Sequence, residues 1–80
     1  MKLTDAQLDT LRKAFRLSPR ETQMIGLIFE GFTENAELAR EMNLTVGSTQ
    51  ALLNHIYAKT RLSDRTKLVL LCLDTLSPLY

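Results

Sequence analysis

The chain lacks most of the residues that mark secreted, membrane or catalytic proteins. Its 80 residues include one cysteine, three glycines, two prolines and no tryptophan. Because a single thiol cannot form an internal disulfide, Cys72 is expected to be a small buried hydrophobe in a reducing, cytoplasmic protein. No apolar run is long enough for a membrane span, and the N-terminus has no apolar signal segment. Glycine-rich phosphate loops, metal-binding Cys/His spacings and a nucleophile paired with a base are all missing. We therefore expect no enzyme activity, no cofactor, no metal and no membrane association.

An excess of positive charge is also missing. Ten lysines and arginines stand against nine acidic residues, for a net charge of +1. Strong nucleic-acid binders usually carry a visibly basic surface. The charges are nevertheless uneven, because residues 21–41 are mainly acidic and residues 59–67 are mainly basic. Positive charge therefore gathers after the segment 45–60.

Strand signals are absent, since no stretch alternates apolar and polar residues between turn residues. Helical spacing of apolar residues occurs throughout and predicts one all-α domain over residues 1–80. The predicted helices cover residues 5–15, 19 to just before Gly31, a short stretch within 32–42, about 46–60 and about 64–76, the last ended by "SPLY".

Capping residues mark where these helices begin. Thr4 and Ser18 each start a capping box, in which the side chains at the cap and three residues later bond to each other's backbone. Thr45 is expected to cap the fourth helix. The cap of the third helix is ambiguous between Thr33 and Asn35.

The short third helix, the tight connection "MNLT" and the longer fourth helix form a unit. Asn43 in this connection can adopt the left-handed conformation that ends helices. Two helices joined by a turn of about four residues match helix-turn-helix geometry. The fourth helix, within residues 45–60, is then a recognition-type helix.

Several segments at nearly fixed spacing, "LSPRE", "GLIFEG", "ELAREMNLT" and "STQALLNHIYAKTRLSDRTKLVL", resemble the LuxR/GerE-type helix-turn-helix domain. The resemblance begins at residue 17 and implies a compact four-helix DNA-binding core over residues 17–76. Residues 1–16 add an N-terminal helix, and we expect a stand-alone regulator. Glu21 and Arg65 fall where the family has a Glu and an Arg. We infer that they pair, although two unrelated exposed charges are the alternative. The expected core comprises Leu17, Ile25, Ile28, Leu38, Met42, Leu44, Leu53, Ile56 and Leu62.

The chain departs from the family pattern at the expected contact surface. Gln50 replaces the usual lysine and Leu52 replaces the usual histidine, and both changes remove positive charge. The segment "GFTENAELA" is one residue longer than usual. The resemblance therefore implies the fold more firmly than it implies DNA binding.

Base recognition is better supplied than phosphate binding. Gln50 and Asn54 are four residues apart on one helix face, and amide side chains suit adenine. Gly47 and Ala51 are small enough to let the helix approach a partner closely. The alternative for both amides is an ordinary solvated face. Phosphate contacts would have to come from cations outside this face, namely Lys59, Arg61 and Lys67, with Arg20 as a further candidate.

The fifth helix is apolar almost all round. Leu68, Leu71 and Cys72 are expected to face the core, which leaves apolar side chains toward solvent unless something covers them. The family pairs through its last helix, so we expect a homodimer. The alternative is that the N-terminal helix covers this surface within one monomer. The residues assigned to the dimer or partner surface are Leu52, Val69, Leu73 and Leu76, with Leu70 also exposed.

These patterns predict a small transcription regulator that binds double-stranded DNA. A different class of function stays open, in which a degenerate LuxR-like domain binds a protein partner through Ala51, Leu52 and the last helix. Leu52 itself can either tuck against the domain as core or lie exposed beside Ala51.

Overall fold

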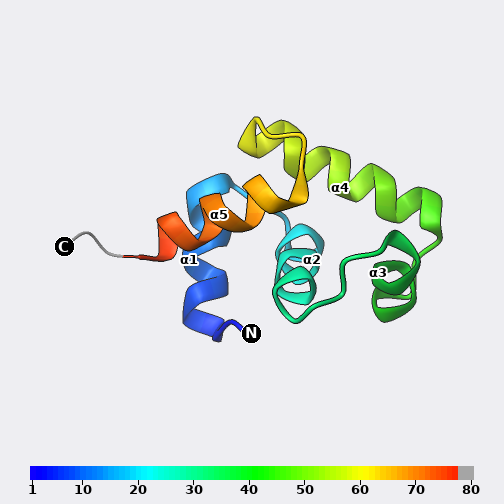
Figure 1. The fold of residues 1–80 in the computed structure, drawn as a ribbon, viewed down its shortest axis with the longest axis horizontal. Helices are drawn as coiled ribbons and strands as arrows, with labels where there is room; N and C mark the ends of the chain where they lie inside the picture. The colour runs from blue at the N-terminus through cyan, green and yellow to red at the C-terminus, as the bar shows by residue number, and fades with distance from the viewer. Residues whose placement is uncertain (78–80) are drawn as a thin grey trace.

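The computed structural model describes residues 1–77, and across them the chain folds into five α-helices without a strand (Figure 1). This confirms the all-α prediction. Residues 78–80, which include the expected stop at Pro78, lie outside the described residues. The helices are α1 (Asp5–Phe15), α2 (Pro19–Phe29), α3 (Asn35–Met42), α4 (Val46–Thr60) and α5 (Arg65–Leu76).

Three of the four predicted helix starts follow the capping residues named from the sequence. Thr4 and Ser18 each form a complete capping box. The Thr45 side chain accepts a hydrogen bond from the Ser48 amide at 3.0 Å. The cap of α3 is a correction, because neither Thr33 nor Asn35 holds that position. Glu34 does, with extended backbone (φ −88°, ψ 146°), and the Asn35 side chain is bonded elsewhere.

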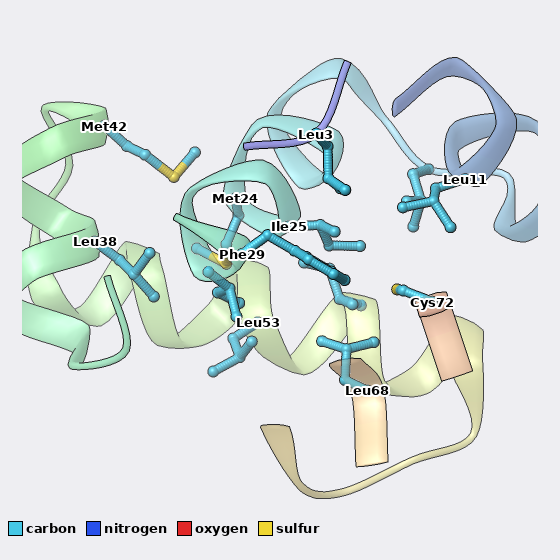
Figure 2. Close-up of a cluster of buried hydrophobic side chains, with 13 residues drawn as sticks. Leu3, Leu11, Met24, Ile25, Phe29, Leu38, Met42, Leu53, Leu68 and Cys72 are labelled. Atoms are coloured by element: carbon cyan, nitrogen blue, oxygen red, sulfur yellow. The ribbon is translucent and has the colours of Figure 1, made fainter. Parts of the chain in front are cut away.

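The core is built around α2. Figure 2 shows Met24, Ile25 and Phe29 of α2 between side chains from the other elements, with α3 on one side and α5 on the other. Leu3 joins this core from the N-terminal segment, whose terminal amine donates to the Phe29 carbonyl at 3.0 Å. Seven of the nine predicted core residues are buried. The other two, Leu44 and Leu62, lie in turns and are half-buried against the core.

The helix-turn-helix unit is present as predicted. Asn43 ends α3 in the left-handed conformation at φ 56°. The Leu44 amide then donates to the Ala39 carbonyl at 2.8 Å, and α4 begins after Thr45. Arg20 of α2 donates to the Met42 carbonyl at 3.2 Å, which satisfies a carbonyl at the end of α3. These contacts hold the end of α3 and the turn that leads into α4.

The inner face of α5 is buried at Leu68 and Cys72. Leu71, which was also expected there, is half-buried. Burial raises the pKa of the Cys72 thiol to about 11, so the thiol stays protonated and unreactive at neutral pH. The prediction of a small buried cysteine is confirmed.

Part of the remaining α5 surface is covered by α1, which packs against α5 and α2. Val69 and Leu76 are half-buried against the core, whereas Leu70 is 59% exposed and Leu73 is 38% exposed. The alternative in which the N-terminal helix covers α5 therefore holds for part of the helix. Among the described helices, none combines the length and apolarity that crossing a bilayer requires.

Candidate nucleic-acid interface

Helix α4 has two opposite stripes of side chains. One stripe is buried against the domain and consists of Thr49, Leu53, Ile56 and Thr60. The other stripe is exposed and contains the residues predicted to meet a ligand. We call it the outer stripe, and its members at helical spacing are Gly47, Gln50, Ala51 and Asn54.

The outer stripe has room for a close partner. At Gly47, a side-chain carbon would meet nothing nearer than the Thr45 hydroxyl at 4.0 Å. Packing inside the protein therefore gives no reason for glycine at this position. A glycine in a helix costs up to about 1 kcal/mol against alanine, less near an end. A missing side chain on an exposed face is consistent with approach by something outside the domain.

Gln50 belongs to a chain of polar side chains that links three helices, exposed at Gln50 and Asn54 and half-buried at Asn35 and Arg65. Arg65, the first residue of α5, donates through its Nη2 to Asn35 Oδ1 at the start of α3. Asn35 Nδ2 donates to Gln50 Oε1 at 2.6 Å, and Gln50 Nε2 donates to Asn54 Oδ1 at 2.9 Å. We call this arrangement the amide relay. The shared face of Gln50 and Asn54 is as predicted, while the part played by Asn35 and Arg65 was not foreseen.

A second polar network lies at the other end of α4. The Lys59 ammonium contacts Glu21 Oε1 at 2.6 Å and the Arg16 carbonyl at 2.8 Å. Glu21 also accepts from the Ser18 amide at 2.7 Å. Burial by itself raises the pKa of Glu21, but the hydrogen bonds from Lys59 and Ser18 outweigh it and leave the pKa below its ordinary value. We call this network the lysine clamp.

The lysine clamp corrects the inferred pair of Glu21 and Arg65. Glu21 is only 3% exposed at the start of α2, where the last turn of α4 brings Lys59 against it. Arg65 extends to Asn35 instead. The sequence offered several cations for one buried carboxylate, and helix packing decided which of them reaches it.

The remaining predicted cations are exposed. Arg61 ends α4 in the left-handed conformation at φ 59°, and Lys67 lies in the first turn of α5. Arg20 is engaged by the Met42 carbonyl. Of the cations predicted to hold phosphate, Arg61 and Lys67 thus have no side-chain hydrogen bond or ion pair within the described part of the chain, whereas the Lys59 ammonium has two partners.

Leu52 lies beside the outer stripe but is half-buried against the core, which favours its interpretation as core. His55 is exposed. Within residues 1–77, no cluster of His, Cys, Asp or Glu could hold a metal ion.

An all-helical domain with a tight helix-turn-helix unit and an exposed second helix defines a helix-turn-helix protein. Comparison with known families gives the finer assignment. The family described as "Bacterial regulatory proteins, luxR family" (GerE) matches residues 16–72, and the chain belongs to this family of DNA-binding regulators. Searches of curated proteins and of solved structures found no match.

Proposed function

We propose that this domain binds double-stranded DNA in a sequence-dependent manner as a transcription regulator, with α4 in the major groove. The observation that carries the proposal is the outer stripe of α4. It combines two amides that suit base edges with two positions that leave space for close approach. Membership of the luxR family of regulators supports the same function. We propose a cytoplasmic location on the same grounds, supported by the free, buried Cys72.

In this proposal the contacts divide into two classes. Gln50 and Asn54 read base edges, while Gly47 and Ala51 permit close approach. Arg61 and Lys67 contact phosphates. Lys59, which the sequence suggested as a third phosphate contact, serves mainly to hold α4 against α2, because its ammonium already has two acceptors.

The test is selection of a preferred duplex from random DNA, followed by titration of variants. Gln50→Ala is expected to weaken binding to the preferred site by about 1–3 kcal/mol and to relax preference at one position. Gln23→Ala is the matched control, since Gln23 is an exposed glutamine on α2 and not a member of the outer stripe. An equal effect of both substitutions would contradict the assignment of Gln50.

Phosphate contacts are tested by the salt dependence of binding. Lys67→Ala is expected to weaken binding to all DNA sequences alike. It should also reduce the slope of the logarithm of the binding constant against the logarithm of salt concentration by about one. Lys2→Ala, which removes an exposed lysine on the N-terminal segment, serves as the control. The absence of saturable binding by the wild type, even at low salt, would overturn DNA binding as a whole.

We further propose that the protein pairs as a homodimer through α5. The exposed side chains of Leu70 and Leu73 support this, and they lie beside Val69, which lines an apolar depression of about 260 Å³. The proposed dimer surface is therefore centred nearer to Leu70 than the sequence suggested, because Leu76 packs against the core of its own chain. Sedimentation of wild type and Leu70→Asp tests it. A monomeric wild type at tens of micromolar would contradict pairing.

A second candidate function is binding of a protein partner in place of DNA. The observation that favours it is the outer stripe itself, whose four residues carry no charge, so phosphate attraction must come from elsewhere. In that case wild type binds no duplex at low salt. Ala51→Asp, on the exposed face, then abolishes capture of a defined partner, while Leu52→Ala mainly lowers stability.

A further inference from the structure

We propose that Asn35 and Arg65 are positioning residues, which set the direction in which the Gln50 amide presents its donor and its acceptor. The inference rests on the proposed function, because it concerns how the outer stripe distinguishes bases. Neither residue needs to touch a base itself. They act through the amide relay, in which each hydrogen bond constrains the next.

The direction of the relay follows from its first member. An arginine guanidinium carries five N–H donors and no acceptor, so Arg65 can only donate. Asn35 must therefore turn its oxygen toward Arg65, which points its NH₂ group at Gln50. An amide without such a donor-only neighbour can present either end, since its oxygen and nitrogen have nearly the same shape.

The same logic continues along α4. Because Asn35 donates, Gln50 turns its oxygen toward Asn35 and its nitrogen toward Asn54. Asn54 in turn accepts with its oxygen, which leaves its NH₂ group as the free end of the relay. One donor-only residue on α5 thereby determines the orientation of three amides on two other helices.

The relay leaves binding capacity on the Gln50 amide. Its oxygen has two lone pairs and uses one on Asn35, and its nitrogen has two protons and uses one on Asn54. One acceptor site and one donor remain, which is the pair that adenine requires at N6 and N7. A reversed amide exchanges the positions of these two groups and no longer matches adenine in the same docking geometry.

Helix stability does not explain why Arg65 and Asn35 occupy their positions. Arg65 stands at the first position of α5, where the helix dipole disfavours a cation. Asn35 stands just inside α3, where its side chain does not cap the helix. The bonds among Asn35, Gln50 and Asn54 are exposed, and exposed polar contacts add little stability.

The first test uses the free protein. Nuclear spin relaxation of the Gln50 side-chain NH₂ group is measured in wild type, Asn35→Ala and Ala36→Ser. The last changes a neighbouring exposed residue of the same helical turn outside the relay. We expect an ordered Gln50 amide in wild type and in the control, and a clearly more mobile one in Asn35→Ala. Equal mobility in all three proteins would overturn the proposal.

The second test reverses the relay without changing its shape. Asn35→Asp introduces an isosteric carboxylate that only accepts, so it keeps the bond from Arg65 and forces Gln50 to turn its nitrogen inward. Ala36→Asp adds the same charge one residue away, without a contact to Gln50. We expect Asn35→Asp to reduce the preference for the base pair that the wild-type protein selects by roughly tenfold. Ala36→Asp should weaken binding to all duplexes equally.

The two tests separate failure of this inference from failure of the proposed function. If Asn35→Asp and Ala36→Asp alter DNA binding in the same way, the positioning role is wrong although DNA binding stands. If wild type binds no duplex, the proposed function fails and the specificity role fails with it. The relaxation measurement then still decides whether Asn35 orients Gln50.

Discussion

The lysine clamp and the amide relay are two polar networks on the same helix that differ in burial and in how many of their hydrogen-bonding groups are already used. The lysine clamp is charged, centred on the buried Glu21, and both of its ions have several partners. The amide relay is exposed at Gln50 and Asn54, and it keeps unused donors and acceptors. A network centred on a buried ion pair mainly holds helices together, whereas an exposed network with unused donors and acceptors can also receive a ligand.

This difference also separates stability from recognition along α4. Removing one member of the lysine clamp leaves a buried charge without its partner, which is costly. Removing one member of the amide relay exposes its neighbours to water, which replaces the lost bond. Substitutions at the C-terminal end of α4 should therefore act on folding, and substitutions on its outer stripe should act on binding.

The largest effect is expected for Lys59→Met, which keeps most of the aliphatic side chain but removes the ammonium. Glu21 then loses its charged partner, and we expect the free energy of unfolding to fall by about 2 kcal/mol. Urea denaturation measures it, with Lys67→Met as a control that should lie within about 0.5 kcal/mol of wild type. Unchanged stability together with a reduced salt slope for DNA would show that Lys59 is a phosphate contact after all.

A smaller effect is expected at the start of α4. Thr45→Ala removes the hydroxyl that accepts from the Ser48 amide, and should cost about 1 kcal/mol of stability. Thr66→Ala, on the exposed side of α5, is the control. A denaturation midpoint that does not move would mean that α4 begins without help from Thr45.

A stabilising effect of less than about 1 kcal/mol is expected for Gly47→Ala, since alanine favours helix and meets no neighbour at this position. The same substitution should weaken binding to DNA, because it fills the gap through which the helix approaches. Thermal unfolding and duplex titration on one sample measure both. Tighter binding would contradict close approach at Gly47.

The smallest expected effect is the part of the pH dependence that the lysine clamp supplies, beside the part from Asp9, whose pKa is lowered by hydrogen bonds from Arg12 and Lys13. The folded pKa of Glu21 lies below its ordinary value of 4.5. The carboxylate therefore contributes stability that is fully present above that value and is lost as the pH falls through the lower folded pKa. Urea midpoints of wild type and Glu21→Gln across this range should converge in acid. Parallel curves would show that the carboxylate is not stabilised by its partners.

The fold was largely predictable because the signals for it are local. The capping boxes at Thr4 and Ser18, the cap at Thr45 and the left-handed Asn43 each act within a few residues. The cap of α3 was predicted wrongly because the local signal is incomplete there. Asparagine often caps helices, but the side chain of Asn35 is held by residues of other helices.

The candidate site was predictable only where one helix carries it. Helical spacing alone places Gln50 and Asn54 on one face, and the structure shows them bonded there. It could not indicate that Asn35, fifteen residues away, meets Gln50, or that Arg65 continues the chain. It also left Lys59 free to bind phosphate, although helix packing directs it to Glu21.

By itself the sequence determined the helices, the caps at Thr4, Ser18 and Thr45, the helix-turn-helix unit and which residues α4 turns outward, because all of these depend on spacings of three or four residues. Only the tertiary structure decided which partner each long polar side chain finds. Lys59 and Glu21 are 38 residues apart, and Arg65 and Asn35 are 30 apart. The sequence contains several cations that could pair with Glu21 or Asn35. The packing of the helices decides which of them lies within reach. The physical division between a buried, ion-paired network and an exposed network with unused hydrogen-bonding groups arises from that selection.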